Sequence, residues 1–295
     1  MNTYKYIKSD AFTSENSLGN PAASIYLENH QELTDAQMLE IARQHKGFVS
    51  EVVYCKSIDS SSYGLAFFSS ECEVNFCGHG TIACMYPLIN NNPQLRVQPE
   101  ISIRTRRKGS LTIYNKIPAQ NAVYISAPDP IHLKIPVTDK EIAKNLQIDI
   151  LEISREYPID FIDAGNRTLI VPISALSDEV SIFPDEQNLK NFTVQNGIDV
   201  VLIFCMDTEK KMHYAHTRVF AAKYGYLEDP ATGSGNAAFG FYMLKNNMWD
   251  GSGITLEQGG NDRIFNTVHL CREKDKLLFG GSATTRIEGI YYSNS

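Results

Sequence analysis

Two carboxylates lead directly into a glycine-rich turn in the stretch Glu228-Asp229-Pro230-Ala231-Thr232-Gly233-Ser234-Gly235-Asn236. Residues 216–220 before it are typical of a strand, and residues 237–245 after it combine good helix formers with an apolar stripe. The first N–H groups of a helix have no partner within the helix, so they attract a carboxylate or a phosphate. We therefore expect Asp229 to lie beside an anion site formed by Gly233, Ser234 and Gly235. An ordinary capped helix start is the competing interpretation.

A second turn of the same kind occurs earlier, in Cys77-Gly78-His79-Gly80-Thr81, and Ile82 is expected to start a helix after it. Its backbone N–H groups would form a second anion site next to an imidazole and a thiol. For His79 the alternative is a structural role, either as an N-cap or as a buried hydrogen-bonding group.

A third candidate is Glu51, a carboxylate within the apolar strand predicted over residues 48–55. Side chains alternate along a strand, so Glu51 would share a face with Val49 and Val53. Apolar surroundings raise the pKa of a carboxyl group toward neutrality, as a general base requires. A charge that protects an exposed strand from aggregation is the alternative.

These candidates recur at similar spacings, which predicts a duplicated fold. Gly19-Asn20 and Gly165-Asn166 are 146 positions apart (165 − 19), Glu51 and Asp199 are 148 apart (199 − 51), and Gly78 and Gly233 are 155 apart (233 − 78). Two equivalent domains would direct two helix starts toward one small anionic ligand.

The remaining patterns predict mostly strands. The expected strands cover residues 4–10, 22–27, 63–68, 101–105, 110–115, 121–126, 168–171 and 198–205, and the expected helices follow Thr34 and cover residues 185–195. Residues 282–292 are expected to form a strand, a turn and a second strand.

The composition is that of a globular protein with an acidic surface. The 295 residues are 43% hydrophobic and 21% charged, with a net charge of −7 and a pI near 5.5. An acidic chain is a poor binder of nucleic acid. The first ten residues lack the apolar core of a signal peptide, and no apolar run is long enough to span a bilayer. We therefore expect a cytoplasmic protein without nucleic-acid or membrane partners.

The six cysteines form no Cys-x-x-Cys pair, and most lie in apolar segments, as reduced buried thiols do. Neither a disulfide framework nor a zinc site is indicated. Phosphate-binding loops, His-Glu-x-x-His and Gly-x-Ser-x-Gly are absent from the sequence.

Taken in order, these motifs resemble those of the PhzF-like phenazine-biosynthesis family, and the resemblance covers essentially the whole chain. The segments that carry it are Asp10-Ala11-Phe12-Thr13, Gly19-Asn20-Pro21, Ser50-Glu51, Phe76-Cys77-Gly78-His79-Gly80-Thr81, Thr217-Arg218-Val219-Phe220, Glu228 to Ser234, Gln258-Gly259 and Gly280-Gly281.

The resemblance implies an α+β protein with the duplicated fold of diaminopimelate epimerase. Each of two pseudo-equivalent domains would be a mainly antiparallel sheet wrapped round a central helix. The implied domains are residues 1–127, with 282–295 returning to them, and residues 128–281. The resemblance also implies a homodimer that needs no cofactor and no metal.

The same resemblance implies an isomerase that moves a proton between carbons of a small carboxylate or amino-acid-like substrate, as trans-2,3-dihydro-3-hydroxyanthranilate isomerase does. Glu51 would be the catalytic base, and His79 and Asp229 would orient the substrate and carry charge. The implied substrate-binding residues are Asn20, Cys77, Gly78, Gly80, Gly233, Ser234 and Gly235. Gly80 and Gly235 stand where alanine is commoner in the family.

Three alternatives stay open. Epimerases of this fold use two thiols, and Cys77 occupies the first of those positions while Thr232 occupies the second. A threonine hydroxyl is too weakly acidic to replace a thiol without a strong neighbouring base, so racemisation by two thiols is disfavoured. A lyase or dehydratase that uses Cys77 alone is the second alternative. A small-molecule binding protein without turnover is the third.

Overall fold

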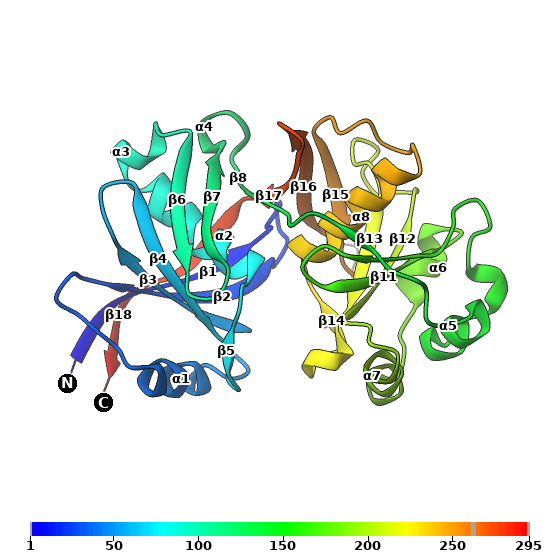
Figure 1. Ribbon diagram of the computed structural model, residues 1–295, viewed down its shortest axis with the longest axis horizontal. Helices are drawn as coiled ribbons and strands as arrows, with labels where there is room; N and C mark the ends of the chain where they lie inside the picture. The colour runs from blue at the N-terminus through cyan, green and yellow to red at the C-terminus, as the bar shows by residue number, and fades with distance from the viewer. Residues whose placement is uncertain (1, 261–263, 294–295) are drawn as a thin grey trace. The chain divides into compact units, whose positions relative to one another are not determined.

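A computed structural model describes residues 2–260 and 264–293 of the chain. The chain divides into two compact units, residues 1–126 with 280–295 and residues 127–279, and Figure 1 shows the elements of each. Among the described residues, no helix is both long and apolar enough to cross a membrane.

The first unit is a sheet built round one buried helix. Its elements are β1 (Asn2–Ala11), β2 (Asn20–Leu27), α1 (Asp35–Gln44), β3 (Glu51–Ser57), β4 (Ser62–Phe68), β5 (Glu73–Val74), α2 (Gly78–Asn90), α3 (Pro93–Arg96), β6 (Glu100–Thr105), β7 (Gly109–Asn115), α4 (Ile117–Gln120), β8 (Val123–Ser126) and β18 (Ala283–Ser293). Helix α2 packs against β1, β2, β3, β8 and β18.

The second unit repeats this plan. Its elements are β9 (Ile131–His132), α5 (Asp139–Leu146), the 3-10 helix η1 (Ile150–Glu152), β10 (Asp160–Asp163), β11 (Arg167–Pro172), α6 (Leu176–Ser181), α7 (Glu186–Gln195), β12 (Val200–Cys205), β13 (His216–Phe220), the 3-10 helix η2 (Ala222–Tyr224), β14 (Glu228–Asp229), α8 (Gly233–Lys245), β15 (Ile254–Gln258), β16 (Asn266–Glu273) and β17 (Lys276–Gly281), whose last residues reach the first unit's range.

Strand pairing shows the duplication more clearly than the sequence does. In the first unit β2 runs parallel to β3, β3 antiparallel to β4, β4 parallel to β6 and β6 antiparallel to β7. In the second unit β11, β12, β13, β15 and β16 repeat the same series of parallel and antiparallel pairs. The predicted fold of two equivalent α+β units, each a mainly antiparallel sheet round a central helix, is confirmed.

The two central helices, α2 and α8, are buried on almost every side. A helix that is apolar all round belongs inside a core, whereas a helix with one apolar stripe covers a surface. Helix α1 is of the second kind, because Met38, Ile41 and Ala42 face the core and Thr34 closes its start with a capping box. The expected helix start at Thr34 is therefore confirmed.

Three predicted boundaries were wrong. Residues 48–50 lie outside β3, because the backbone N–H groups of Phe48 and Val49 donate to the carbonyl of His45 in the turn that follows α1. Both central helices begin earlier than expected, at Gly78 and Gly233, so the glycine turns are themselves helical.

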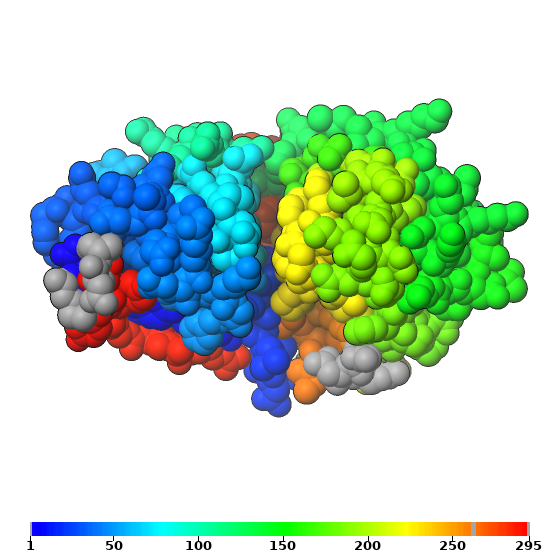
Figure 2. All heavy atoms as spheres, turned by 90° about the horizontal axis from the view of Figure 1, so that it is seen from below, coloured from blue at the N-terminus to red at the C-terminus, as the bar shows by residue number. Residues whose placement is uncertain are grey.

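The last strand also differs from the expectation of a strand, a turn and a strand. Residues 283–293 form the single strand β18, which pairs antiparallel with β1 and takes up one bulge opposite Lys8 and Ser9. Figure 2 shows the red surface of β18 beside the dark blue surface of β1. Strand β1 therefore has a partner on both edges, with β2 on its other side.

Candidate functional site

The start of α2 brings three of the predicted residues into contact. The Oε2 atom of Glu51, the first residue of β3, lies 2.8 Å from Nε2 of His79, in the first turn of α2. Sγ of Cys77, the N-cap residue, lies 3.3 Å from Nδ1 and 3.7 Å from Nε2 of the same ring. The result is a compact cluster of carboxylate, imidazole and thiol.

Burial strengthens the electrostatic interactions among these three side chains. The side chains of Glu51 and His79 are only 15% and 10% exposed. Burial by itself lowers the pKa of the His79 imidazole, but the sulfur of Cys77, the carboxylate of Glu51 and their hydrogen bonds outweigh it and raise that pKa well above its usual value. His79 is therefore protonated over a wider pH range than a free histidine.

Cys77 is held as a thiol by the same surroundings. Burial and the nearby carboxylate of Glu51 raise the pKa of the Cys77 thiol, although His79 and the N–H of Gly80 oppose that effect. The pKa values of the imidazole and of the thiol are therefore both raised in this cluster. Sγ accepts a hydrogen bond from the Gly80 N–H at 3.2 Å, which orients the thiol toward the helix start.

Gly80 fits this site tightly. A Cβ atom at Gly80 would lie 3.0 Å from Cγ2 of Val53 and 3.1 Å from Sγ of Cys77. An alanine at this position would therefore press on the thiol and on the strand behind it. Because Gly80 has no Cβ, the Cys77 thiol can lie in contact with His79.

Asn20 is fully buried at the first position of β2, where it pairs with Ala11 of β1. Glu51 pairs with Ala22 of the same strand, two residues further along. Asn20 and Glu51 therefore belong to neighbouring strands, both at the end where those strands begin.

The second unit holds Asp229 within a buried network of amides and hydroxyls. Thr232 donates its hydroxyl to the Asp229 carboxylate, and Gln258 donates from Nε2 to the Asp229 carbonyl at 2.8 Å. The Gln258 amide oxygen in turn accepts from the Thr232 N–H at 2.8 Å and from Asn236 at 2.6 Å. This network fixes the loop before α8.

Sequence reasoning missed most of that network. Thr232, Asn236 and Gln258 are all buried polar residues, and a buried amide requires partners for both its oxygen and its nitrogen. The sequence signal that could have identified them was their position, next to the glycine turn for Thr232 and Asn236 and in the Gln258-Gly259 motif for Gln258. The pattern of residues gave no distances, so it did not show that they bind one another.

The start of α8 keeps backbone donors available. Its N-cap, Thr232, makes no side-chain cap hydrogen bond, because its hydroxyl is used on Asp229. Ser234 accepts a hydrogen bond from Nδ2 of Asn166 at 2.8 Å. Gly233 approaches Phe279 so closely that a Cβ would lie 2.3 Å from the ring. An uncapped helix start is suited to an anionic ligand.

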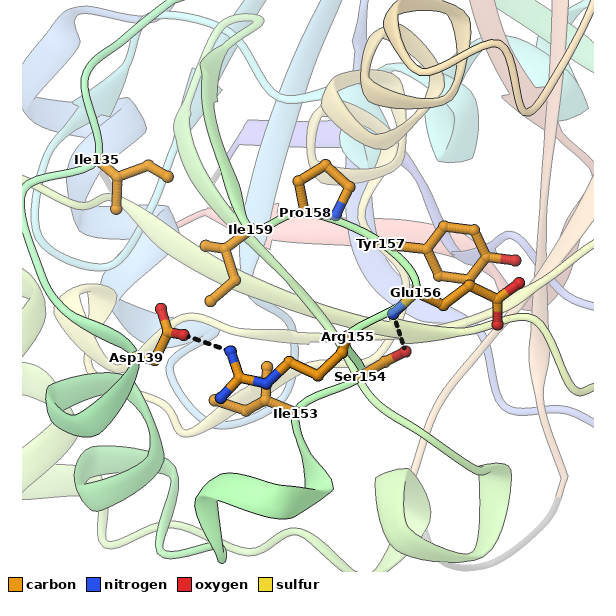
Figure 3. A pocket seen from close by; sticks show the side chains of 9 residues that line it. All are labelled: Ile135, Asp139, Ile153, Ser154, Arg155, Glu156, Tyr157, Pro158 and Ile159. Carbon is orange, nitrogen blue, oxygen red and sulfur yellow. Dashed lines mark hydrogen bonds and ion pairs between the residues drawn. The ribbon is translucent and has the colours of Figure 1, made fainter.

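A hollow of about 490 Å³ elsewhere in the second unit holds none of the predicted residues. Figure 3 shows its lining, in which Arg155 pairs with Asp139 at 2.8 Å beside Ser154 and the ring of Tyr157. Its only charged neighbours in that view neutralise each other or face outward, and it lacks a buried acid or base. We assign the chemistry to the glycine-turn residues and not to this hollow.

A duplicated sheet-and-helix fold, with polar groups gathered at the start of each central helix, places the protein in the epimerase-like fold class. The chain belongs to the PhzC-PhzF family, described as phenazine biosynthesis-like protein, whose pattern matches residues 9–289.

Individual relatives agree with this family. The chain is 28% identical to an "Uncharacterized isomerase YfhB" of Bacillus subtilis over 263 residues, which cover 88% of this chain and 87% of the relative. A crystal structure of a PhzF-family phenazine biosynthesis protein from Bacillus anthracis covers 99% of this chain and all of its own, at 23% identity and a TM-score of 0.85. A "Predicted Epimerase" of Pseudomonas aeruginosa has the same fold, at 17% identity, a TM-score of 0.75 and coverage of 99% and 100%.

Proposed function

We propose that the protein is an isomerase that moves a proton between two carbons of a small carboxylate or amino-acid-like substrate, with Glu51 as the base. The observation that carries this proposal is the buried carboxylate of Glu51 against the imidazole of His79 at the start of α2. Relatives named as isomerases and a neighbour named as an epimerase support an activity of the isomerase or epimerase type.

Glu51 is suited to take a proton from carbon and to return it. A positioned carboxylate in a site with little water accepts a proton in the transition state more readily than one in water. The proton leaves one substrate carbon for Glu51 and is then delivered to another, so no atom or electron is gained or lost. Protonated His79 holds the carboxylate in one orientation and stabilises its charged form before the first transfer and after the second.

The substrate carboxylate has a natural binding group in the glycine turns. We propose that the N–H groups of Gly78 to Gly80, beside Glu51, bind it, because helix starts attract anions. The N–H groups of Gly233 to Gly235 at the start of α8 are proposed as a second anion-binding group in their own unit. Asp229 is proposed as a second acid–base group, supported by its burial and by the hydroxyl that Thr232 donates to it. A homodimer in the cytoplasm remains part of the proposal.

The first test is proton NMR in D2O with dihydro-hydroxyanthranilate and a panel of cyclic or aromatic amino acids. We expect deuterium to enter a carbon position of the true substrate. Glu51→Gln keeps the size of the side chain and removes the base, so we expect exchange to fall by about 100-fold or more. Exchange that survives in Glu51→Gln would refute Glu51 as the base.

A matched control is Cys77→Ala, which tests the other base at the same helix start. Since burial raises the pKa of the Cys77 thiol, we expect this variant to retain exchange within about tenfold. Loss in Cys77→Ala alone, with release of water or ammonia from the substrate, would favour the lyase that uses the cysteine. A compound that binds and stabilises both variants but never exchanges would favour a binding protein.

A further inference from the structure

A second triplet of glutamate, cysteine and histidine lies in the second unit and includes none of the predicted site residues. It consists of Glu179 in α6, Cys205 at the end of β12 and His216 at the start of β13. Cys205 and His216 are paired directly across the antiparallel strands. Side chains paired in this way lie on the same face of a sheet.

That face is the one opposite α8. Phe204, next to Cys205 in β12, packs its ring 4.5 Å from Phe239 of α8. Because neighbouring residues of a strand point to opposite faces, Cys205 points away from α8. Helix α6, which carries Glu179, packs on β12. Three separate elements thus bring their side chains to one place.

Their ligand atoms converge. One carboxylate oxygen, one ring nitrogen and the sulfur all lie within 4.8 Å of one another, and Nδ1 of His216 is 3.0 Å from Oε2 of Glu179. The donor atoms round one tetrahedral zinc ion lie about 3–4 Å apart, given metal–ligand lengths of about 2.0–2.3 Å. The spacing is that of a metal site with small adjustment.

Two members of the triplet, Glu179 and His216, are unsatisfied by protein groups alone, whereas the Cys205 thiol donates to the Asp207 carbonyl at 3.2 Å. Glu179 and His216 are fully buried. Within the described residues, neither carboxylate oxygen of Glu179 and neither ring nitrogen of His216 has an aligned hydrogen-bond partner; their 3.0 Å approach meets the distance but not the alignment. A buried carboxylate without donors is destabilising unless another group compensates for its lost hydration.

Neighbouring charges leave room for a cation. Arg218 is a neighbouring positive group, and it is neutralised by two hydrogen bonds to Glu228, at 3.0 and 2.8 Å. Its Nη1 donates to the backbone carbonyls of Glu179 and Ile182. A divalent ion bound by one carboxylate, one thiolate and one neutral imidazole makes a group of zero net charge, which suits a buried place.

We propose that Glu179, Cys205 and His216 bind a divalent metal ion, and the chemistry of the three donors favours zinc. Carboxylate, thiolate and imidazole are the three side-chain types that bind zinc, and the thiolate disfavours magnesium and calcium. Binding displaces the thiol proton of Cys205 to solvent and joins α6, β12 and β13. This inference does not depend on the proposed isomerase activity.

The protein's own residues complete the surroundings of such an ion. The ring of Phe265 lies edge-on to His216 with 4.5 Å between centroids, so an apolar wall covers the imidazole. A thiol that coordinates a metal ion is deprotonated. Metal binding is therefore expected to weaken as pH falls.

The test uses the full chain. Because the triplet is buried, the ion is expected to enter during folding, so the protein is refolded from urea with Zn²⁺, with Co²⁺ or with chelator. We expect one zinc per chain by elemental analysis after dialysis, a higher melting temperature than with chelator, and thiolate-to-cobalt charge-transfer absorption in the cobalt form.

Variants assign the site. We expect Cys205→Ser and Glu179→Gln to lower zinc content at least tenfold and Cys205→Ser to remove the cobalt absorption. Cys77→Ser is the control for the other triplet, and Cys84→Ser is the control for a buried cysteine outside both; both should keep the metal. If Cys205→Ser does not fold, a cobalt–thiolate band kept by both controls still supports the proposal. Two results would overturn the proposal. In the first, wild-type protein refolded with Zn²⁺ contains no zinc and wild-type protein refolded with Co²⁺ shows no cobalt–thiolate band. In the second, the band is lost in Cys77→Ser.

Discussion

At the scale of single residues, the start of α2 shows how three ordinary side chains acquire unusual properties from one another. Oε2 of Glu51 lies 2.8 Å from Nε2 of His79, and Nδ1 of His79 lies 3.3 Å from Sγ of Cys77. Their mutual interactions shift the pKa values of His79 and Cys77. Burial strengthens these electrostatic interactions because little solvent screens them.

The raised pKa of His79 makes stability depend on pH. A group whose pKa is higher in the folded than in the unfolded protein stabilises the fold below its unfolded value, near 6.5, and this stabilisation is lost as pH rises through the folded value. We therefore expect the difference in free energy of unfolding between wild type and His79→Gln to shrink from pH 6 to pH 9. Urea unfolding at several pH values measures it. A difference that grows with pH would contradict the protonated state.

Thr232 supports a different prediction at this scale. Its hydroxyl donates to the Asp229 carboxylate and accepts from Nε2 of Gln258 at 3.1 Å. Thr232→Val keeps the shape and removes both bonds, so we expect a loss of about 1–3 kcal/mol in free energy of unfolding. Thr3→Val, at an exposed position of β1, is the control and should change it by less than about 0.5 kcal/mol. Equal effects in both variants would show that the Thr232 network adds no stability.

At the scale of elements, the sequence predicted what depends on neighbours along the chain. The Thr34 capping box, the alternating strands of the first unit and the two glycine helix starts all have local signals. Strand β18 has no such local signal, because glycine is typical of a turn and Gly289 suggests one. In the structure Gly289 lies opposite Tyr6 within the pairing of β18 with β1. Its conformation is set by a strand at the other end of the chain.

The candidate site shows the same division. Glu51, His79 and Asp229 could be selected by residue type and spacing, since carboxylates and an imidazole beside helix starts are recognisable chemistry. The contact of His79 with both Glu51 and Cys77 depends on how β3 packs beside α2. Glu179, Cys205 and His216 come from three elements and share no local spacing, so pattern alone could not assemble them.

Helix α8 makes a prediction about close packing. Gly233 lies against the ring of Phe279, where an added Cβ would meet two ring carbons at 2.3 and 2.5 Å. We expect Gly233→Ala to lower the free energy of unfolding by about 1–3 kcal/mol, because a buried ring has no room to move. Gly253→Ala adds a Cβ with nothing within 4 Å and should change it by less than about 0.5 kcal/mol. Chemical denaturation compares the pair; a neutral Gly233→Ala would mean that the ring can shift.

At the scale of the whole molecule, the two ends of the chain are neighbours in one sheet. Asn2 pairs with Ser293, and paired residues of antiparallel strands have Cα atoms about 4.5–5.5 Å apart. We expect a circular permutant, with these ends joined by a short Gly/Ser linker and a new start at Ser60 in the exposed turn between β3 and β4, to fold and keep its activity within about tenfold.

The comparison for that permutant is one with the same linker and a new start inside β2, at Ile25, whose side chain is fully buried. Far-ultraviolet circular dichroism and the exchange assay report on both. Folding of the Ser60 form and failure of the Ile25 form are expected. Failure of the Ser60 form would show that the order of the chain, and not only its contacts, is required.

The return of β18 to β1 also determines when each unit can fold during synthesis. The second unit is one continuous stretch, residues 127–279, whereas the first unit takes its last strand from residues 283–293. A ribosome releases the chain from its N-terminus onward, and domains generally fold as units. The unit that is made first is therefore completed last, and β1 waits with one edge unpaired while the rest of the protein is translated. An exposed strand edge is a site of aggregation. Slow translation or a truncated message would therefore expose this protein to aggregation at β1, which is synthesised first, rather than at the strands synthesised last.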